Sequence, residues 1–155
     1  MKRLFLITVF FLGLIATQAQ DVKWYTDVNE AIAVGKKLNK PLLLFFTGSD
    51  WCGWCIRLQK EVLKTPEFTN WAKEKVVLVE LDFPRRASQS NELRMQNNGM
   101  QQAFQVTGYP TVWFATAQVK DGKPAFSGLG KTGYVAGGPA NWLAGANEIL
   151  KQKIN

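Results

Sequence analysis

Two cysteines, Cys52 and Cys55, are the only ones in this chain of 155 residues, and two residues separate them. The apolar segment 42–46, which precedes them, has the composition of a buried strand. After them, polar residues recur at intervals of three and four, as on one face of a helix: Arg57, Lys60, Glu61 and Lys64. The pair is therefore expected where a buried strand ends and a helix begins.

A thiol at the start of a helix lies beside backbone N–H groups that have no partner within the helix, and beside the positive end of the helix dipole. Both favour the thiolate, which is the form that attacks disulfides. A second thiol one turn further along can then attack the mixed disulfide and release the partner. The spacing of Cys52 and Cys55 therefore predicts thiol–disulfide exchange.

A structural disulfide and a structural metal site are the two other uses that these cysteines could have. A disulfide across so short a loop stabilises the fold little, by about 2 kcal/mol on the chain-entropy estimate. Structural zinc usually takes four Cys or His ligands, and the chain contains no histidine. We therefore favour redox chemistry, and we expect no metal and no cofactor besides a redox-active Cys52–Cys55 disulfide.

The N-terminus has the pattern of a secretory signal peptide. A short basic start precedes the apolar stretch 4–15, and Thr17 and Ala19 stand at positions −3 and −1 of the expected cleavage site. An uncleaved anchor is the alternative, but about 12 apolar residues are short for a span that needs roughly 20. We expect residues 1–19 to be removed and residues 20–155 to work as one domain in the periplasm or another exported, oxidising compartment.

The composition limits the partners that the chain can have. Hydrophobic residues make up 46% and charged residues 20%, as in an ordinary globular domain. The formal net charge is +7, but the basic residues are scattered and form no basic–aromatic repeat. We therefore expect no nucleic-acid partner. No dimerisation segment is visible, and we expect a monomer.

The order of the expected elements favours an α/β fold. Residues 42–46 and 76–81 are apolar runs with helical sequence between them, which predicts a parallel βαβ unit. A turn at 121–123 joins two further strands, at 112–115 and 125–128, into a hairpin. The remaining expected elements are an edge strand at 22–25 and helices at 27–38, from Pro66 onward, at 91–104 and from Pro139 to about Lys151. Together they predict a central mixed sheet with helices on both faces.

A resemblance to a known family is carried by three groups of residues: Phe45-Phe46, Trp51-Cys52-Gly53-Trp54-Cys55 and Gly108-Tyr109-Pro110-Thr111. On these residues the chain resembles the thioredoxin superfamily over most of 22–155. More narrowly, residues 48–55 together with Asp82-Phe83-Pro84 are similar to exported bacterial thioredoxin-like proteins, including the DsbH type. The resemblance implies a thioredoxin fold.

The resemblance also implies roles for individual residues. Cys52 would be the exposed nucleophile and Cys55 the buried resolving thiol. Pro110 would follow a cis peptide bond and face the cysteines, which leaves the backbone of Tyr109 to pair with an extended partner; an ordinary trans proline is the alternative. Trp54, at the helix tip, is expected to be exposed and to dock apolar segments. The expected substrate-binding residues are Trp51, Gly53, Trp54, Tyr109 and Pro110.

The chain departs from the family pattern in three places. The strand 42–46 lacks the buried Asp that thioredoxins carry beneath the resolving cysteine, so the proton of Cys55 must leave by another route, to water or to Asp50. The dipeptide Gly53-Trp54 contains no histidine to stabilise the thiolate. The stretch from Asp82 to Pro110 is longer than in compact thioredoxins by roughly a dozen residues. Its polar part, the 83–98 loop, either selects partners or is only decoration.

These observations predict an exported thiol–disulfide oxidoreductase. A helix terminus without a histidine, and with Asp50 nearby, lowers the Cys52 pKa only moderately from about 8.5. A moderate pKa favours a reductase of protein disulfides over an oxidant. A membrane electron donor of the DsbD type would recharge it. The alternatives are an oxidase or disulfide isomerase, a reductant dedicated to cytochrome c maturation, and a non-catalytic binding module with the same fold.

Overall fold

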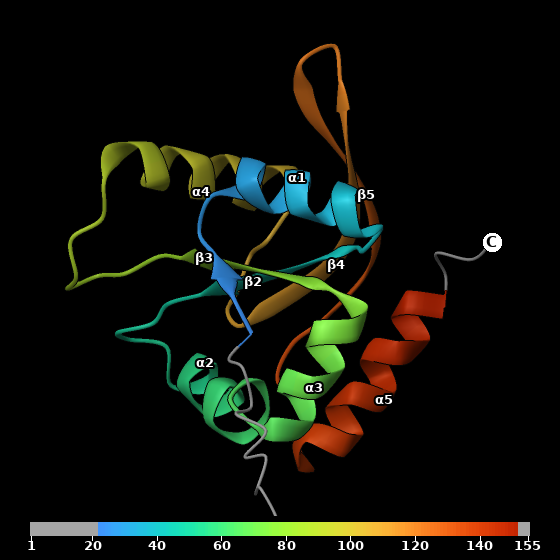
Figure 1. Ribbon diagram of the computed structural model, residues 1–155. Helices are drawn as coiled ribbons and strands as arrows, with labels where there is room; N and C mark the ends of the chain where they lie inside the picture. Colours follow the sequence, from blue (N-terminus) through green and yellow to red (C-terminus); the bar gives the residue numbers. More distant parts are fainter. Residues whose placement is uncertain (1–21, 152–155) are drawn as a thin grey trace, which may run out of the picture.

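The computed structural model describes residues 22–151, so the predicted signal peptide at 1–19 lies outside the described residues (Figure 1). No helix within 22–151 is long and apolar enough to cross a membrane. In chain order the elements are β1 (Trp24–Tyr25), α1 (Val28–Leu38), β2 (Leu42–Thr47), α2 (Gly53–Leu58), the π-helix η1 (Gln59–Leu63), α3 (Pro66–Lys75), β3 (Val77–Asp82), α4 (Asn91–Ala103), β4 (Thr111–Lys120), β5 (Lys123–Thr132) and α5 (Gly138–Lys151).

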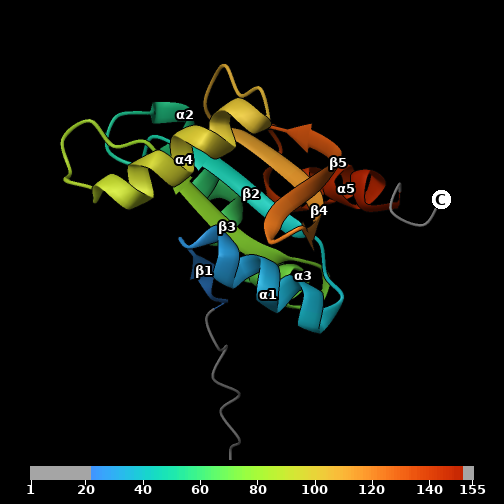
Figure 2. The ribbon, with the colours of Figure 1, turned by 90° about the horizontal axis from the view of Figure 1, so that it is seen from above.

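The five strands form one mixed sheet in the order β1-β3-β2-β4-β5. β3 pairs in parallel with both β1 and β2, whereas β4 is antiparallel to β2 and to β5. Helices α1 and α4 cover one face of the sheet, and α2, α3 and α5 cover the other (Figures 1 and 2). The predicted α/β architecture, with helices on both faces of a mixed sheet, is confirmed.

The central strand β2 is buried along its whole length. Leu43 and Phe45 point into the core cluster that contains both cysteines, while Leu44 and Phe46 point into the cluster beneath α1 and α4. This alternation follows from the pleat of a strand, in which successive side chains face opposite sides. A strand covered on both faces needs apolar residues at every position, which explains the continuous apolar run in the sequence.

An aromatic cluster fixes the helices on the cysteine side of the sheet. The ring of Phe68 lies 6.3 Å from that of Trp24, 5.7 Å from that of Trp71 and 5.8 Å from that of Trp142, centroid to centroid. The buried Trp142 indole donates a hydrogen bond to the carbonyl of Gly133, 3.0 Å away. The cluster therefore joins α3 and α5 to the strand β1 at the sheet edge, and it accounts for three of the tryptophans.

The structure differs from the expected hairpin strands and from the expected helix after the cysteines. The hairpin strands β4 and β5 each have ten residues, well beyond the expected 112–115 and 125–128. The helix after the cysteines changes at residue 59 into a π-helix, which the sequence pattern did not predict. The helix expected at 91–104 is confirmed as α4, which starts at Asn91 with the Ser90 side chain accepting a hydrogen bond from the backbone N–H of Leu93. Only the first half of the 83–98 loop is therefore irregular.

The first prediction concerns the expected cap of α1. The Asp27 carboxylate accepts hydrogen bonds from the backbone N–H groups of Asn29, at 2.7 Å, and Glu30, at 3.2 Å. We expect Asp27→Ala to lower the free energy of unfolding by about 1 kcal/mol, because two N–H groups at the helix start lose their acceptor. Asp27→Asn keeps an acceptor and should stay within a few tenths of the wild-type value. Urea titration measures both, and an equal loss in the two variants would contradict the capping role.

Candidate active site

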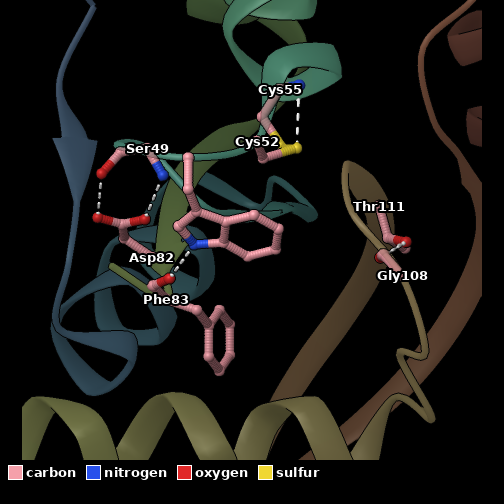
Figure 3. The surroundings of a disulfide bond; sticks show 8 residues. Ser49, Cys52, Cys55, Asp82, Phe83, Gly108 and Thr111 are labelled. Carbon is pink, nitrogen blue, oxygen red and sulfur yellow. Dashed lines mark hydrogen bonds between the residues drawn. A yellow bond between two sulfur atoms is a disulfide. The ribbon is translucent and has the colours of Figure 1, made fainter. Parts of the chain in front are cut away.

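The cysteines lie where the sequence predicted, at the junction of the segment after β2 and the helix α2 (Figure 3). They form a disulfide, with their Cα atoms 5.2 Å apart. Cys52 is the cap residue of α2, and its Sγ accepts a hydrogen bond from the backbone N–H of Cys55 at 3.2 Å. Cys55 is fully buried, whereas Cys52 keeps 6% of its surface accessible. The order of exposure agrees with the expectation, but Cys52 is far less exposed than predicted because it packs into the core cluster.

The segment before the cysteines is tied to the end of β3. The Asp82 carboxylate accepts hydrogen bonds from the Ser49 backbone N–H at 2.8 Å and from the Ser49 hydroxyl at 2.6 Å (Figure 3). The Trp51 indole N–H donates to the carbonyl of Phe83 at 2.8 Å. These contacts fix residues 49–51 relative to the end of β3, and they thereby set the position at which α2 begins.

Asp50 binds the other side of the same junction. Its carboxylate accepts hydrogen bonds from the backbone N–H groups of Arg85, Arg86 and Ala87, at 3.0, 2.6 and 2.9 Å. Hydrogen bonds from the Arg85 and Ala87 N–H groups are the largest causes that lower the pKa of Asp50 to about 2. A carboxylate so acidic is a poor base near neutral pH. The expectation that Asp50 could take the proton of Cys55 is therefore wrong, because its lone pairs already serve the 85–87 loop.

The predicted cis peptide bond is present between Tyr109 and Pro110. The Tyr109 ring meets the Trp51 ring edge-on, with centroids 5.7 Å apart, and packs against the core cluster that contains both cysteines. Its hydroxyl accepts a hydrogen bond from the Gln101 side chain of α4 at 2.8 Å. The turn from Gly108 to Thr111 lies beside the disulfide (Figure 3), so the proline loop and the cysteines share one site.

The two tryptophans of the motif lie in different surroundings. Trp51 is half-buried, and the Arg85 guanidinium lies 3.7 Å from its ring centroid. A side chain at Gly48 would place its Cβ 2.4 Å from the Trp51 ring, which explains the glycine there. Trp54 is 56% exposed, as predicted. Trp51 therefore supports the loop, and Trp54 offers an aromatic surface to solvent next to the nucleophile.

Comparisons with known proteins agree with this geometry. Residues 23–117 match the family described as Thioredoxin-like. The chain belongs to this family. The disulfide bond reductase DsbH of Chlamydia pneumoniae is 35% identical to the chain over 133 residues, which are 86% of this chain and 75% of the relative.

Two solved structures resemble the thioredoxin-like fold of this chain. One, described as DsbH oxidoreductase, matches with a TM-score of 0.77 and 32% identity, and the match covers 94% of this chain and 95% of the other. A thioredoxin from Thermus thermophilus matches with a TM-score of 0.59 and 18% identity, over 83% and 87% of the two chains, and supports the fold alone. With a disulfide across Cys52 and Cys55, this thioredoxin-like protein is a thiol–disulfide oxidoreductase.

A cluster beside Trp54 was missed by the sequence reasoning. Tyr134, from the segment between β5 and α5, places its ring 5.2 Å from that of Trp54 and donates its hydroxyl hydrogen to Glu61 at 2.6 Å. Arg57 donates to the same carboxylate at 2.7 Å, and its guanidinium lies 5.5 Å from the Trp54 ring centroid. The hydrogen bond from Tyr134 is the largest cause that lowers the pKa of Glu61, and the hydrogen bond from Arg57 is the next. No local pattern linked Tyr134 to a helix 73 residues away.

Among residues 22–151, no group of three or more His, Cys, Asp or Glu side chains is arranged to hold a metal ion.

The second prediction follows from the low pKa of Asp50. A carboxylate whose pKa is lowered in the folded state stabilises the fold above its unfolded pKa, about 3.9, and loses that effect as the pH falls through about 2. We expect Asp50→Asn to be less stable than wild type at pH 7, with a difference that disappears near pH 2. Urea titrations across this pH range measure it. Asp121→Asn is the matched control, because Asp121 lies in a turn with φ 51, which Asn also tolerates; a pH-independent deficit of the Asp50 variant would contradict the assignment.

Proposed function

We propose that this protein reduces disulfide bonds of other exported proteins by cycling between the Cys52–Cys55 disulfide and the dithiol. One observation supports this most directly. Cys52 caps the helix with its Sγ next to the Cys55 N–H and keeps some exposure, while Cys55 is buried directly behind it. The relative DsbH of Chlamydia pneumoniae is described as a disulfide bond reductase, in agreement with this direction.

In the proposed mechanism, Cys52 attacks and Cys55 resolves. The Cys52 thiolate attacks one sulfur of a partner disulfide, forms a mixed disulfide and releases the other partner sulfur as a thiolate. Cys55 then loses its proton and attacks Cys52 Sγ, which restores the Cys52–Cys55 disulfide and releases the second partner sulfur. Two electrons pass from the protein to the partner, and the partner thiolates take protons from solvent.

We also propose that the partner binds along the surface formed by Gly53, Trp54 and the Tyr109–Pro110 loop. Gly53 is exposed and nothing lies within 4 Å of where its Cβ would be, so a partner chain can approach the nucleophile there. An extended partner segment would pair with the backbone at Tyr109, in the manner of strand addition. Trp54 would contact apolar side chains beside the disulfide. Trp51 acts indirectly, by supporting this surface from below.

The direction of electron flow is argued from the surroundings of Cys52. Within the described residues, the hydrogen bond that Cys52 Sγ accepts comes from one backbone N–H, that of Cys55. Strong oxidants require a much more strongly stabilised thiolate. A modestly stabilised thiolate favours a reductase. Such an enzyme must regain electrons after each cycle, and we propose a membrane electron donor of the DsbD type as its source.

We propose that the mature protein comprises residues 20–155, is exported after removal of the signal peptide at 1–19, and acts as a monomer in the periplasm or an equivalent compartment. The basic, apolar and small-residue order of the N-terminus supports export. No nucleic-acid partner and no cofactor besides the disulfide are part of this proposal.

The third prediction separates the roles of the two cysteines. Dithiothreitol reduces insulin slowly, and the wild-type protein should accelerate this reaction. Cys52→Ser should abolish the acceleration, because the attacking sulfur is lost. Cys55→Ser should also lose turnover but should hold partner proteins as mixed disulfides on Cys52, visible on non-reducing gels. Capture by Cys52→Ser but not by Cys55→Ser would reverse the assigned roles. Equal inactivity of wild type and both variants would favour the non-catalytic binding module instead.

The fourth prediction concerns the acidity of Cys52. We expect its pKa in the reduced protein to lie only moderately below the ordinary value of about 8.5. Thiolate ultraviolet absorbance of the reduced protein, titrated in wild type and in Cys55→Ser, measures it. The Cys52→Ser variant serves as the control for the buried thiol. A pKa near 4 would make the protein an oxidant and would overturn the proposed direction.

A further inference from the structure

One partly buried acid lies on the redox side of the sheet, outside the interactions described above. Glu80 belongs to β3, where it is paired in register with Phe45 of β2. Side chains two residues apart in a strand face the same side. Glu80 therefore shares the face of Leu78, which packs in the core cluster that contains Cys55. Within residues 22–151, no hydrogen bond to the Glu80 carboxylate is found.

Glu80 lines a cavity of about 260 Å³ beneath the helix that follows the cysteines. The volume is enough for several water molecules, since each occupies about 30 Å³ in the liquid. The lining includes Gln59, which follows Cys55 by four residues and thus lies one helical turn away on the same side of the helix. The cavity therefore adjoins the helical turn that follows the resolving cysteine, and Glu80 lies in its lining. Its lining residues are Trp24, Phe45, Gln59, Leu63, Lys64 and Glu80.

A second polar group on this face also lacks a protein partner. The hydroxyl of Thr47 is fully buried and, among the described residues, makes no hydrogen bond. Thr47 follows Phe45 by two residues in β2, so it faces the same side, closer to the cysteines. Buried polar groups without a protein partner are commonly bound by ordered water. Two independent features on the redox face of the sheet thus indicate internal water.

We propose that Glu80 accepts, through water in this cavity, the proton that Cys55 loses when it resolves the mixed disulfide. This inference rests on the proposed function. The S–H bond of Cys55 breaks, its proton passes to water and then to the Glu80 carboxylate, and the sulfur forms a bond to Cys52 Sγ. The bond between Cys52 and the partner sulfur breaks, and the partner leaves as a thiolate. The proton later returns from Glu80 to solvent.

The electrostatic surroundings of Glu80 suit this role. Burial, and to a smaller extent the charge of Asp82, raise the pKa of Glu80, while Lys64 opposes the shift. A raised pKa makes the carboxylate a better proton acceptor at neutral pH. The charged groups that face it are Asp82 on the same strand and Lys64 after η1, and the other side chains that line the cavity are uncharged.

A two-phase reaction can isolate the resolving step. The reduced protein is mixed with an aromatic disulfide whose released thiolate is coloured. The first release reports attack by Cys52, and the second reports resolution by Cys55. At pH 7 we expect Glu80→Gln to slow the second phase about tenfold or more and to change the first phase less than twofold. The deficit should shrink as the pH rises, because hydroxide from solution then increasingly replaces the carboxylate as the proton acceptor.

The controls separate proton transfer from packing. Glu67→Gln removes an exposed carboxylate of α3 and should leave both phases unchanged. Glu80→Asp keeps a carboxylate and should stay within about threefold of wild type in the second phase. A deficit that is the same at every pH, an equal loss in both phases, no loss in Glu80→Gln, or a loss as large in Glu80→Asp overturns the proposal. Absence of the first phase in wild type would instead contradict the proposed function itself.

Discussion

Two carboxylates hold the redox pair in place. Asp82 receives the backbone and hydroxyl hydrogens of Ser49, and Asp50 receives three backbone N–H groups of residues 85–87. The segment before α2 and the segment at the end of β3 are therefore bound to each other twice. Each supplies one carboxylate that accepts hydrogen bonds from the other. Every further feature of the site depends on this link, because it fixes where α2 starts and hence where Cys52 Sγ meets the Cys55 N–H.

A continuous aromatic contact extends the link to the proline loop. The Trp51 ring meets the Tyr109 ring edge-on, and Phe83 packs against the same tyrosine with centroids 5.2 Å apart. Since Tyr109 is also hydrogen-bonded by Gln101, helix α4 supports the loop from behind. The additional chain between β3 and the proline thus contributes contacts that support the surface where we propose that partners bind.

The sequence was sufficient to predict the fold and the position of the two cysteines between a buried strand and a helix. Continuous apolar runs identified β2 and β3, and the resemblance to the thioredoxin superfamily implied the cis bond before Pro110. The wrong expectation for Asp50 had a different origin: its proximity in sequence to the cysteines suggested a proton acceptor for Cys55, whereas its hydrogen bonds go to a loop 35 residues away. Contacts of this kind depend on which loops meet in space, and no local pattern records them.

The contribution of Tyr134 and Glu80 was hidden for the same reason. Each is unremarkable in its own segment, and each acquires its surroundings only when β3 and the β5–α5 segment pack beside the cysteine helix. The limited exposure of Cys52 could not be predicted from the sequence either. The position of a thiol at a helix start indicates its acidity, but the side chains that cover it are known only from the structure.

The π-helix after α2 has a consequence for how this chain can vary. A π-helical turn amounts to an α-helix with one residue inserted, and such turns are frequent at functional sites. Deleting one residue between 59 and 63 would let this segment close into a regular α-helix, so the elements that follow would keep their orientation relative to the cysteines. The change would fall on the turn itself, where Val62 and Leu63 are buried and Glu61 accepts a hydrogen bond from Tyr134. The inserted residue is therefore a local feature that shapes the surface beside Trp54 and is separable from the fold.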